Sequence, residues 1–281
     1  MAQSFTQQFR VPPDGKIRIG DIDPADTRLA DGKKQAKAAH AADLVAIREL
    51  QYALYAEGKQ GLLICLQAPD AAGKDGTIRR LSPALNPQGC HVVSFKVPTE
   101  IERDHDFLWR IHPHAPRRGG ISIFNRSHYE DVLVVRVKDL APEPVWQARF
   151  DHINNFEKLL FDNGTRILKF YLCISPQEQL ERFEKRLDDP AKNWKISVAD
   201  YTERDFWDAY VSAYEDVFSR CSPDHAPWFI IPADKKWYRD FVIARIIREQ
   251  LEAMAMKIPE PSVDLADIRR RYFAEVQESE A

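Results

Sequence analysis

The stretch from Gly61 to Ile78, with the sequence GLLICLQAPDAAGKDGTI, constrains the fold more than any other part of the chain. Its five consecutive apolar residues, Leu62 to Leu66, are bounded by turn-forming residues, a pattern typical of a strand buried on both faces of a sheet. A loop of small residues follows and ends at Gly73 and Lys74, and a helix is predicted from about Thr77 to Leu85. Strand, small-residue loop, lysine and helix start together predict a phosphate-binding loop, because backbone N–H groups and the helix dipole both favour an anion there.

This loop matches the Walker A pattern G-x-x-x-x-G-K-[ST] imperfectly, since Ala68 replaces the first glycine and Asp75 replaces the final Ser or Thr. The usual hydroxyl ligand of magnesium is therefore missing, and Asp70 adds a carboxylate that an ordinary loop of this kind does not require. Magnesium prefers oxygen ligands, so we expect Asp70 to hold or orient the metal or an acceptor phosphate. The alternative is a Gly/Ala turn with a solvated lysine. The remaining loop residues expected to contact phosphate are Ala71, Ala72, Gly73, Lys74, Asp75, Gly76 and Thr77, and Glu130, further along the chain, is expected to bind phosphate or nucleotide with them.

Apolar and polar segments alternate without a change in composition from Leu62 to the end, which predicts one α/β domain with a mainly parallel five-stranded sheet. The predicted strands span 62–66, 91–95, 120–124, 166–173 and 228–231. The predicted helices span 33–57, 77–85, 104–111, 145–162, 176–187, 203–220, 237–257 and 263–276. We assign residues 33–258 to this domain, 1–32 to an extended N-terminal arm and 259–281 to a C-terminal helical tail. The polar arm needs a partner surface to become ordered, so we expect it to pack on a neighbouring subunit of a homo-oligomer.

The overall charge and the cysteines narrow the class of protein. Among the 281 residues, 44% are apolar and the net charge is −3, so no global excess of positive charge calls for nucleic acid or an acidic membrane. The apolar runs are too short to span a bilayer, and Met1 to Arg10 lack the apolar core of a signal peptide. The four cysteines are scattered, as expected in a reducing compartment. We expect a cytoplasmic protein without a membrane or nucleic-acid partner.

A second reactive segment follows the predicted strand that ends at Phe124. Ligands of a parallel sheet bind beyond the carboxyl ends of its strands, where enzymes with phosphate-binding loops place a second magnesium contact. Asn125 offers only a neutral oxygen, so we expect it to act through water, and Arg126 would aim its guanidinium at phosphate. Ser127 and Glu130 form a candidate capping box for a helix toward Val134. The alternative is a capped helix with a surface arginine.

The predicted helix 176–187 carries Arg182 and Arg186 on one face, and Lys192 and Lys195 follow it. A helix of this kind over a phosphate site can act as a lid, about residues 176–200, that adds arginine to the transferring phosphoryl group. However, five acidic residues balance five basic ones between Pro176 and Lys195. A solvated, ion-paired helix explains the same pattern, and both interpretations stay open on these residues alone.

Four segments resemble motifs of the polyphosphate kinase 2 family. They are residues 66–78 for its Walker A region, 123–132 for its Walker B region, 186–195 for its lid, and 226–235 near the C-terminus, and the similarity covers roughly residues 40–250. The resemblance implies a fold similar to thymidylate kinases and transfer of a phosphoryl group between inorganic polyphosphate and a nucleotide, with magnesium. Manganese can take the place of magnesium in our expectation. The segment around Glu130 resembles the class III subgroup, whose members accept AMP as well as ADP.

Carried over by position, the resemblance gives each motif residue a role. It implies that Asp70 orients the metal or the acceptor phosphate, Lys74 holds phosphate, Arg126 contacts the transferring phosphates, and Arg182 and Arg186 are lid arginines. Many members have Asp where this chain has Asn125, so a direct metal contact at that position is not carried over. Between the second and third strands, Arg117 and Arg118 are expected to line a track for polyphosphate, or else to be ordinary surface charges.

Three functions are therefore compared. The first is a polyphosphate-dependent phosphotransferase that converts AMP and ADP to ADP and ATP reversibly, without a phosphoenzyme intermediate; an enzyme restricted to ADP is a variant of it. The second is a nucleoside monophosphate kinase with ATP as donor. The third is a binding protein without catalytic activity. The departures from the Walker A and Walker B patterns at Ala68, Asp75 and Asn125 are compatible with it. The sequence does not fix the preferred direction, base selectivity or chain-length preference.

Overall fold

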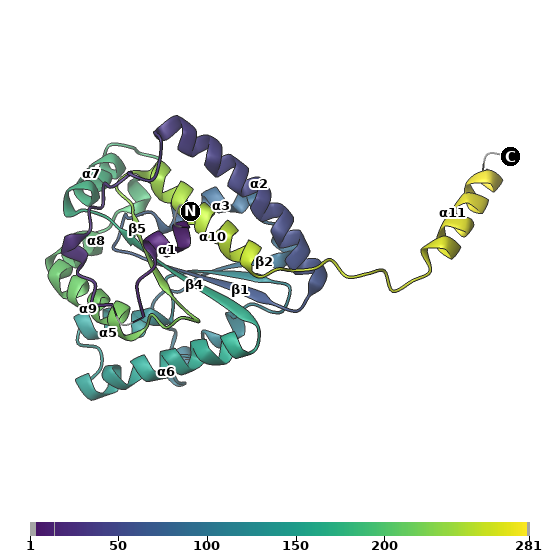
Figure 1. The fold of residues 1–281 in the computed structure, drawn as a ribbon. Helices are drawn as coiled ribbons and strands as arrows, with labels where there is room; N and C mark the ends of the chain where they lie inside the picture. The colour runs from purple at the N-terminus through teal and green to yellow at the C-terminus, as the bar shows by residue number, and fades with distance from the viewer. Residues whose placement is uncertain (1–3, 14, 280–281) are drawn as a thin grey trace.

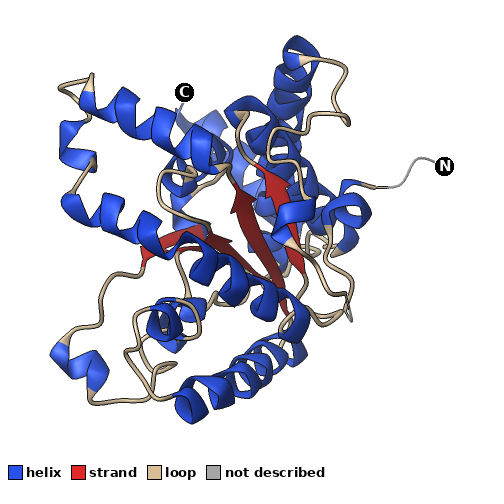
Figure 2. Ribbon diagram, turned by 90° about the vertical axis from the view of Figure 1, so that its left-hand side faces the viewer, coloured by secondary structure: helices blue, strands red, loops and turns tan. Residues whose placement is uncertain are grey.

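A computed structural model describes residues 4–13 and 15–279 of the chain. Its centre is a five-stranded, all-parallel sheet in the order β2-β3-β1-β4-β5 (Figures 1 and 2), as the sequence predicts. The strands are β1 (Gly61–Gln67), β2 (Cys90–Ser94), β3 (Ile121–Asn125), β4 (Thr165–Cys173) and β5 (Trp228–Pro232). Every residue of β1 is buried, which explains its uninterrupted apolar run.

Helices cover both faces of this sheet. On one face lie α2 (Lys33–Glu57), α3 (Lys74–Leu81) and α10 (Lys236–Ala253), which pack on alternate β1 residues including Leu62 and Leu66. On the other lie α6 (Glu143–Asp162) and α9 (Trp207–Arg220), as Figure 1 shows. Successive residues of a strand point to opposite faces of the sheet, so β1 contributes side chains to the hydrophobic cores on both faces.

The carboxyl edge of the sheet carries the segments that matter for function. The parallel register places Leu66 of β1 beside Asn125 of β3, so the phosphate-binding loop and residues 125–131 begin next to each other. Short elements follow β3, namely the 3-10 turn η5 (His128–Asp131) and α5 (Val134–Val137). Above the edge run α7 (Pro176–Leu187), the turn η6 (Asn193–Lys195) and α8 (Val198–Thr202), then the turn η7 (Glu203–Phe206).

Several local predictions need correction. α3 begins at Lys74, not Thr77, because the phosphate-binding loop leads directly into the helix. The helix predicted for 104–111 is wrong: those residues form turns, and the helix is α4 (Glu100–Arg103), where Thr99 and Glu102 form a capping box. Ser127 is a cap, but it accepts from the Tyr129 N–H and starts a 3-10 turn.

The N-terminal arm was predicted to be extended and to seek a partner, but its described part packs on its own chain. It contains α1 (Phe5–Phe9) and the turn η1 (Ile19–Asp21). Phe5 packs edge-to-face on Phe241 of α10, with ring centroids 5.2 Å apart. The N–H groups of Phe5 and Thr6 donate to Glu249, and Val11 is buried in the core. The arm therefore needs no second subunit to be ordered.

The C-terminal tail behaves differently. The helix α11 (Leu265–Ser279) forms, close to the predicted bounds of 263–276, but it lies apart from the body at the end of an extended segment (Figure 1). Apolar side chains on it, including Ile268, Tyr272 and Phe273, are exposed. Within the described residues, no helix is long and apolar enough to cross a membrane.

Candidate active site

A cleft of about 1090 Å³ opens at the carboxyl edge of the sheet. Its walls come from three places: the phosphate-binding loop, the end of β3, and the segment α7–η6. Predicted site residues that line it are Asp70, Ala71, Gly73, Lys74, Asp75, Gly76, Asn125, Arg126, Arg182, Arg186, Lys192 and Lys195. The structure thus brings together the three segments that the sequence singled out separately.

The phosphate-binding loop requires a glycine at position 73. Gly73 has φ of +111°, a backbone conformation that other residues rarely adopt, and a Cβ there would lie 2.0 Å from Nη1 of Arg239. Ala71 also has a positive φ, of +61°. Ala72 is buried and presents its carbonyl to neighbouring arginines, while Thr77 is buried beneath the loop and does not line the cleft.

Lys74 holds its ammonium group inside this loop. Its Nζ donates to the carbonyl oxygen of Ala68 at 2.8 Å. Burial lowers the pKa of Lys74, although the nearby carboxylate of Asp70 opposes that change. The lysine is therefore a desolvated cation beside the loop, and a desolvated charge interacts strongly with an anion.

Arg126 reaches across from β3 to the loop. Its Nη2 lies 2.9 Å from Oδ1 of Asp70, and its backbone N–H donates to the Leu66 carbonyl. Burial lowers the pKa of Arg126, but the carboxylates of Glu130 and Asp70 outweigh it and raise the pKa overall. Glu130 does not line the cleft and acts on it through this charge.

Asn125 and Asp75 contact each other at the mouth of the cleft. The Asn125 amide donates to Oδ1 of Asp75 at 2.7 Å. In the described part of the chain, no group of three or more His, Cys, Asp or Glu side chains gathers as a metal site would require. Near the phosphate-binding loop and the end of β3, Asp70, Asp75 and the Asn125 carbonyl offer oxygen ligands, and this set suits magnesium, which keeps several waters and phosphate oxygens as ligands.

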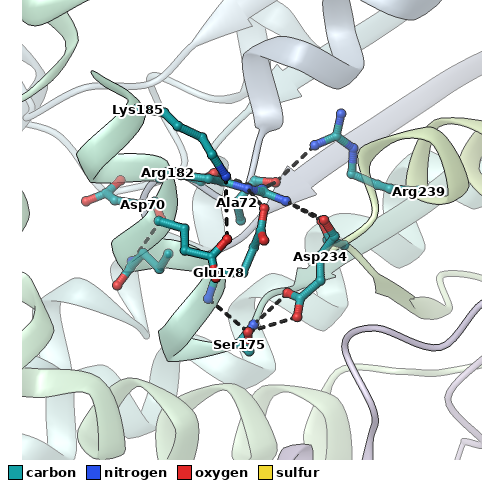
Figure 3. A network of polar contacts seen from close by, with 12 residues as sticks. Asp70, Ala72, Ser175, Glu178, Arg182, Lys185, Asp234 and Arg239 are labelled. Carbon is teal, nitrogen blue, oxygen red and sulfur yellow. Dashed lines mark hydrogen bonds and ion pairs between the residues drawn. The ribbon is translucent and has the colours of Figure 1, made fainter. Parts of the chain in front are cut away.

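Arg182 lines the cleft, but its guanidinium is bonded to the protein itself, so its contact with a phosphate stays a prediction. Its guanidinium donates to the carbonyls of Ala71, Ala72, Ala233 and Asp234 and to the carboxylate of Glu178, at 2.6 to 3.1 Å. These five bonds use all five donors of an arginine. Figure 3 shows Arg182 between Ala72 and Asp234, with Arg239 reaching the same Ala72 carbonyl. Arg182 therefore ties the phosphate-binding loop to the end of β5.

Arg186, one turn further along α7, fits the lid prediction. It is half-buried, lines the cleft and donates one hydrogen bond, to the carbonyl of Lys195 at 2.9 Å. That bond joins the helix to the following turn, which brings Lys192 and Lys195 to the same wall. Lys192 also pairs with Asp189. The pair of Lys192 with Asp189 agrees with the ion-paired interpretation, and the position of Arg186 on the cleft is compatible with a lid, which stays a prediction.

Arg117 and Arg118 were placed wrongly by the sequence. Both are exposed and precede β3, so they lie at the amino edge of the sheet, opposite the cleft. Arg117 instead stacks over the Tyr55 ring, with 5.5 Å from its Cζ to the ring centroid. The crossover from β2 returns to the amino edge before β3 begins, as every parallel connection must.

Sequence reasoning missed most of the remaining cations of the cleft. Those it missed are Arg79 and Arg80 on α3, Lys185 on α7, and Lys236 and Arg239 on α10, whereas Lys96 after β2 lies in the crossover from which a polyphosphate track was predicted. Lys236 and Arg239 lie in the first turn of α10, shortly after the carboxyl end of β5. Because ligands bind beyond the carboxyl ends of parallel strands, this position could have marked them as candidate site residues.

Comparisons with known proteins identify the family and the fold. The family model described as Polyphosphate kinase 2 matches residues 30–259. The chain is 50% identical over 256 residues to an AMP/ADP-polyphosphate phosphotransferase of Meiothermus ruber, covering 91% of this chain and 96% of that protein. It is 42% identical to an ADP-polyphosphate phosphotransferase of Rhodopseudomonas palustris, covering 91% and 92%. The crystal structure of Polyphosphate Kinase 2 from Arthrobacter aurescens superposes with a TM-score of 0.94 at 39% identity, covering 97% and 98% of the two chains.

Proposed function

The chain belongs to the polyphosphate kinase 2 family, and on this premise we propose that it transfers a phosphoryl group from inorganic polyphosphate to AMP and to ADP, giving ADP and ATP, reversibly. The observation that carries the proposal is the position of Lys74 and Arg126, two cations from different strand ends, on the same cleft beside Asp70. Phosphoryl transfer asks a protein mainly for placement and charge neutralisation, and these residues supply both.

The cleft suits a reaction between two polyanions. Lys74 neutralises phosphate at the loop, Arg126 reaches the same point from β3, and Arg186 adds charge from the lid. The further cations on α3, α7 and α10 extend the positive lining away from the loop, as a donor made of many phosphates requires. No side chain needs to carry the phosphoryl group itself, so direct transfer from donor to acceptor is the simplest mechanism.

Magnesium, or manganese in its place, is part of the proposal. Asp70 would hold it, with Asn125 acting through water, and it would supply positive charge that offsets the charge of the phosphates. The ion pair between Arg126 and Asp70 gives that carboxylate a fixed orientation in the cleft. Asp75, which accepts from Asn125, would keep the Asn125 amide oriented.

Two further proposals concern location and assembly. We propose a cytoplasmic location, because the four cysteines are scattered as in proteins of a reducing compartment, and no nucleic-acid partner, because the net charge is −3. We also propose a homo-oligomer, now through the exposed apolar side chains of α11 instead of the N-terminal arm. Mass measurement of the full chain by light scattering tests the second statement, and a monomeric mass would contradict it.

Purified protein with magnesium, long-chain polyphosphate and either AMP or ADP tests the function by chromatography. We expect ADP and ATP from AMP, ATP from ADP, and loss of both in Lys74→Ala. Turnover of ADP alone would make the chain an ADP-specific enzyme. Transfer only from ATP to a monophosphate would make it an ordinary nucleotide kinase, and no transfer from any donor would favour the binding protein without catalytic activity.

A further inference from the structure

Arg126 holds its backbone in a conformation that an arginine avoids. Its φ is +61°, in the left-handed region, where a Cβ crowds the backbone and strains any residue with a side chain. Such a conformation persists only where the surroundings fix it. On one side the N–H of Arg126 donates to Leu66 of β1 at 3.1 Å. Something must also fix the chain on the other side.

The next residues, His128 and Tyr129, are anchored below the sheet edge. Both side chains are fully buried. Nε2 of His128 lies 3.1 Å from Oε1 of Glu157, and the Tyr129 hydroxyl donates to the same oxygen at 2.9 Å. Glu157 belongs to α6, so a carboxylate from a distant helix grips the segment two residues after Arg126. Ser127 adds a bond of 3.3 Å from the Gln67 amide of β1.

Lys169 of β4 completes the cluster. Its Nζ donates to Oε2 of Glu157 at 2.5 Å, to the Tyr129 hydroxyl at 2.8 Å and to the Cys221 carbonyl at 2.8 Å. Lys169 and Glu157 are both 0% exposed. Burial raises the pKa of Glu157, but the charge of Lys169 and the bond from His128 outweigh it and leave the pKa lowered.

Stability alone does not explain a buried charge pair at this place. Apolar side chains of similar size often stabilise a protein as well as a buried ion pair or better, because both charges lose their hydration. The cluster even leaves Nδ1 of His128 without a hydrogen-bond partner among the described residues. The cluster instead fixes the position of one end of the segment that carries Arg126.

We propose that Glu157, Lys169 and His128 are positioning residues, which hold Arg126 in its left-handed conformation and thereby set its guanidinium against Asp70 and the transferring phosphate. This inference rests on the proposed function, because its main readout is phosphoryl transfer. The three residues touch neither the cleft nor, in this arrangement, any substrate. They act through the backbone of Ser127 and Arg126.

The test replaces the ion pair by apolar residues of similar size, in the variant Glu157→Leu/Lys169→Met. No buried charge is left unpaired, but the Tyr129 hydroxyl and the Cys221 carbonyl lose partners, so we expect the melting temperature to fall by several degrees while the protein stays folded. We expect kcat with polyphosphate and ADP to fall by about 10- to 100-fold, since small displacements of a reacting group have effects of this size. We expect the KM for ADP to change less than threefold.

A cycle with Arg126→Ala distinguishes positioning from a general structural effect. In the Arg126→Ala background, the two apolar substitutions should change turnover and the dissociation constant of tripolyphosphate less than twofold, because the group they act through is absent. The dissociation constant, measured by calorimetry, shows the effect of the substitutions on phosphate binding even where turnover is too slow to measure. As a matched control, Asp43→Asn removes another carboxylate that is 0% exposed, paired with Arg245 between α2 and α10, and should leave kcat unchanged.

Three results would overturn the inference. The first is a folded Glu157→Leu/Lys169→Met protein with the kcat of the wild type. The second is the same fold-change in the Arg126→Ala background as in the wild type. The third is misfolding of the apolar variant, which would mean that the pair serves folding. A wild-type protein that does not use polyphosphate would instead remove the proposed function.

Discussion

Nη1 of Arg182 lies 2.7 Å from the carbonyl oxygen of Ala72, on the rear of the phosphate-binding loop. Through this bond and its contacts with Ala233 and Asp234, the arginine connects two strand ends of the sheet. Arg186, four residues later on the same helix, lines the cleft and donates one side-chain hydrogen bond, to the Lys195 carbonyl. Two arginines on one face of the same helix thus differ in their contacts: Arg182 is bonded to the protein, and Arg186 faces the cleft.

Substitution of these two arginines should separate stability from turnover. Arg182→Lys should lower the free energy of unfolding by about 2–4 kcal/mol, because lysine cannot replace a planar five-donor fork and leaves buried carbonyls unpaired. Arg186→Lys should leave stability within about 0.5 kcal/mol, as surface changes do, but lower kcat at least about tenfold. Urea unfolding and steady-state kinetics measure the two. Equal effects of both variants on stability would contradict the assignment.

Gly73→Ala should destabilise the protein by about 2 kcal/mol or more, because the left-handed backbone is strained by a Cβ and the Cβ meets Arg239. Arg239→Ala should therefore cost less in the Gly73→Ala protein than in the wild type. A double-mutant cycle of unfolding free energies measures this coupling. Gly20→Ala is the control, since no atom lies within 4 Å of its added Cβ. Additive effects at Gly73 and Arg239 would contradict the close approach.

Asp131 should make stability depend on pH. Burial raises its pKa to about 6, against the opposing charge of Arg149, so the folded protein keeps a proton that the unfolded chain loses near pH 4. Stability from this group is therefore complete below about pH 4 and falls as the pH rises through 6, by roughly 3 kcal/mol at most. Asp131→Asn does not titrate, so its stability relative to the wild type should rise between pH 4 and pH 7. Parallel urea-unfolding profiles of the two proteins would refute the shift.

Two pairs of adjacent arginines test which edge of the sheet binds the donor. Arg79→Ala/Arg80→Ala removes two cations that line the cleft and should raise the KM for polyphosphate severalfold. Arg117→Ala/Arg118→Ala removes the same charge from the opposite edge and should leave that KM within twofold. Steady-state kinetics with long-chain polyphosphate compares them. A larger effect from Arg117 and Arg118 would restore the track that the sequence predicted.

The sheet could be predicted because buried parallel strands leave a simple sequence pattern, as in the apolar run Leu62 to Leu66. The segment 104–111 misled the prediction because Phe107, Leu108 and Ile111 have helical spacing, but Asp106 bonds to the Leu108 N–H and starts a turn instead. Local hydrogen bonds of this kind compete with a helix and are not visible in apolar periodicity.

In the site, residues that belong to a loop motif were predicted, and residues defined by tertiary contacts were not. Lys74 and Arg126 stand at strand ends, which the chain order fixes. The work of Arg182 depends on carbonyls 51 and 110 residues away in sequence. The position of Arg239 in the cleft depends on the packing of α10 against the loop. The position of Arg117 depends on the edge of the sheet to which the crossover from β2 to β3 returns.

The most direct test of the account follows the phosphoryl group itself. Uniformly ³²P-labelled polyphosphate is incubated with magnesium, the protein and unlabelled AMP, with no ATP added, and the nucleotides are separated by chromatography. We predict that label enters ADP and then ATP, that it is absent from the acid- and base-quenched protein, and that Lys74→Ala stops its transfer. Label that stays in polyphosphate while the protein phosphorylates AMP from added ATP would contradict the account.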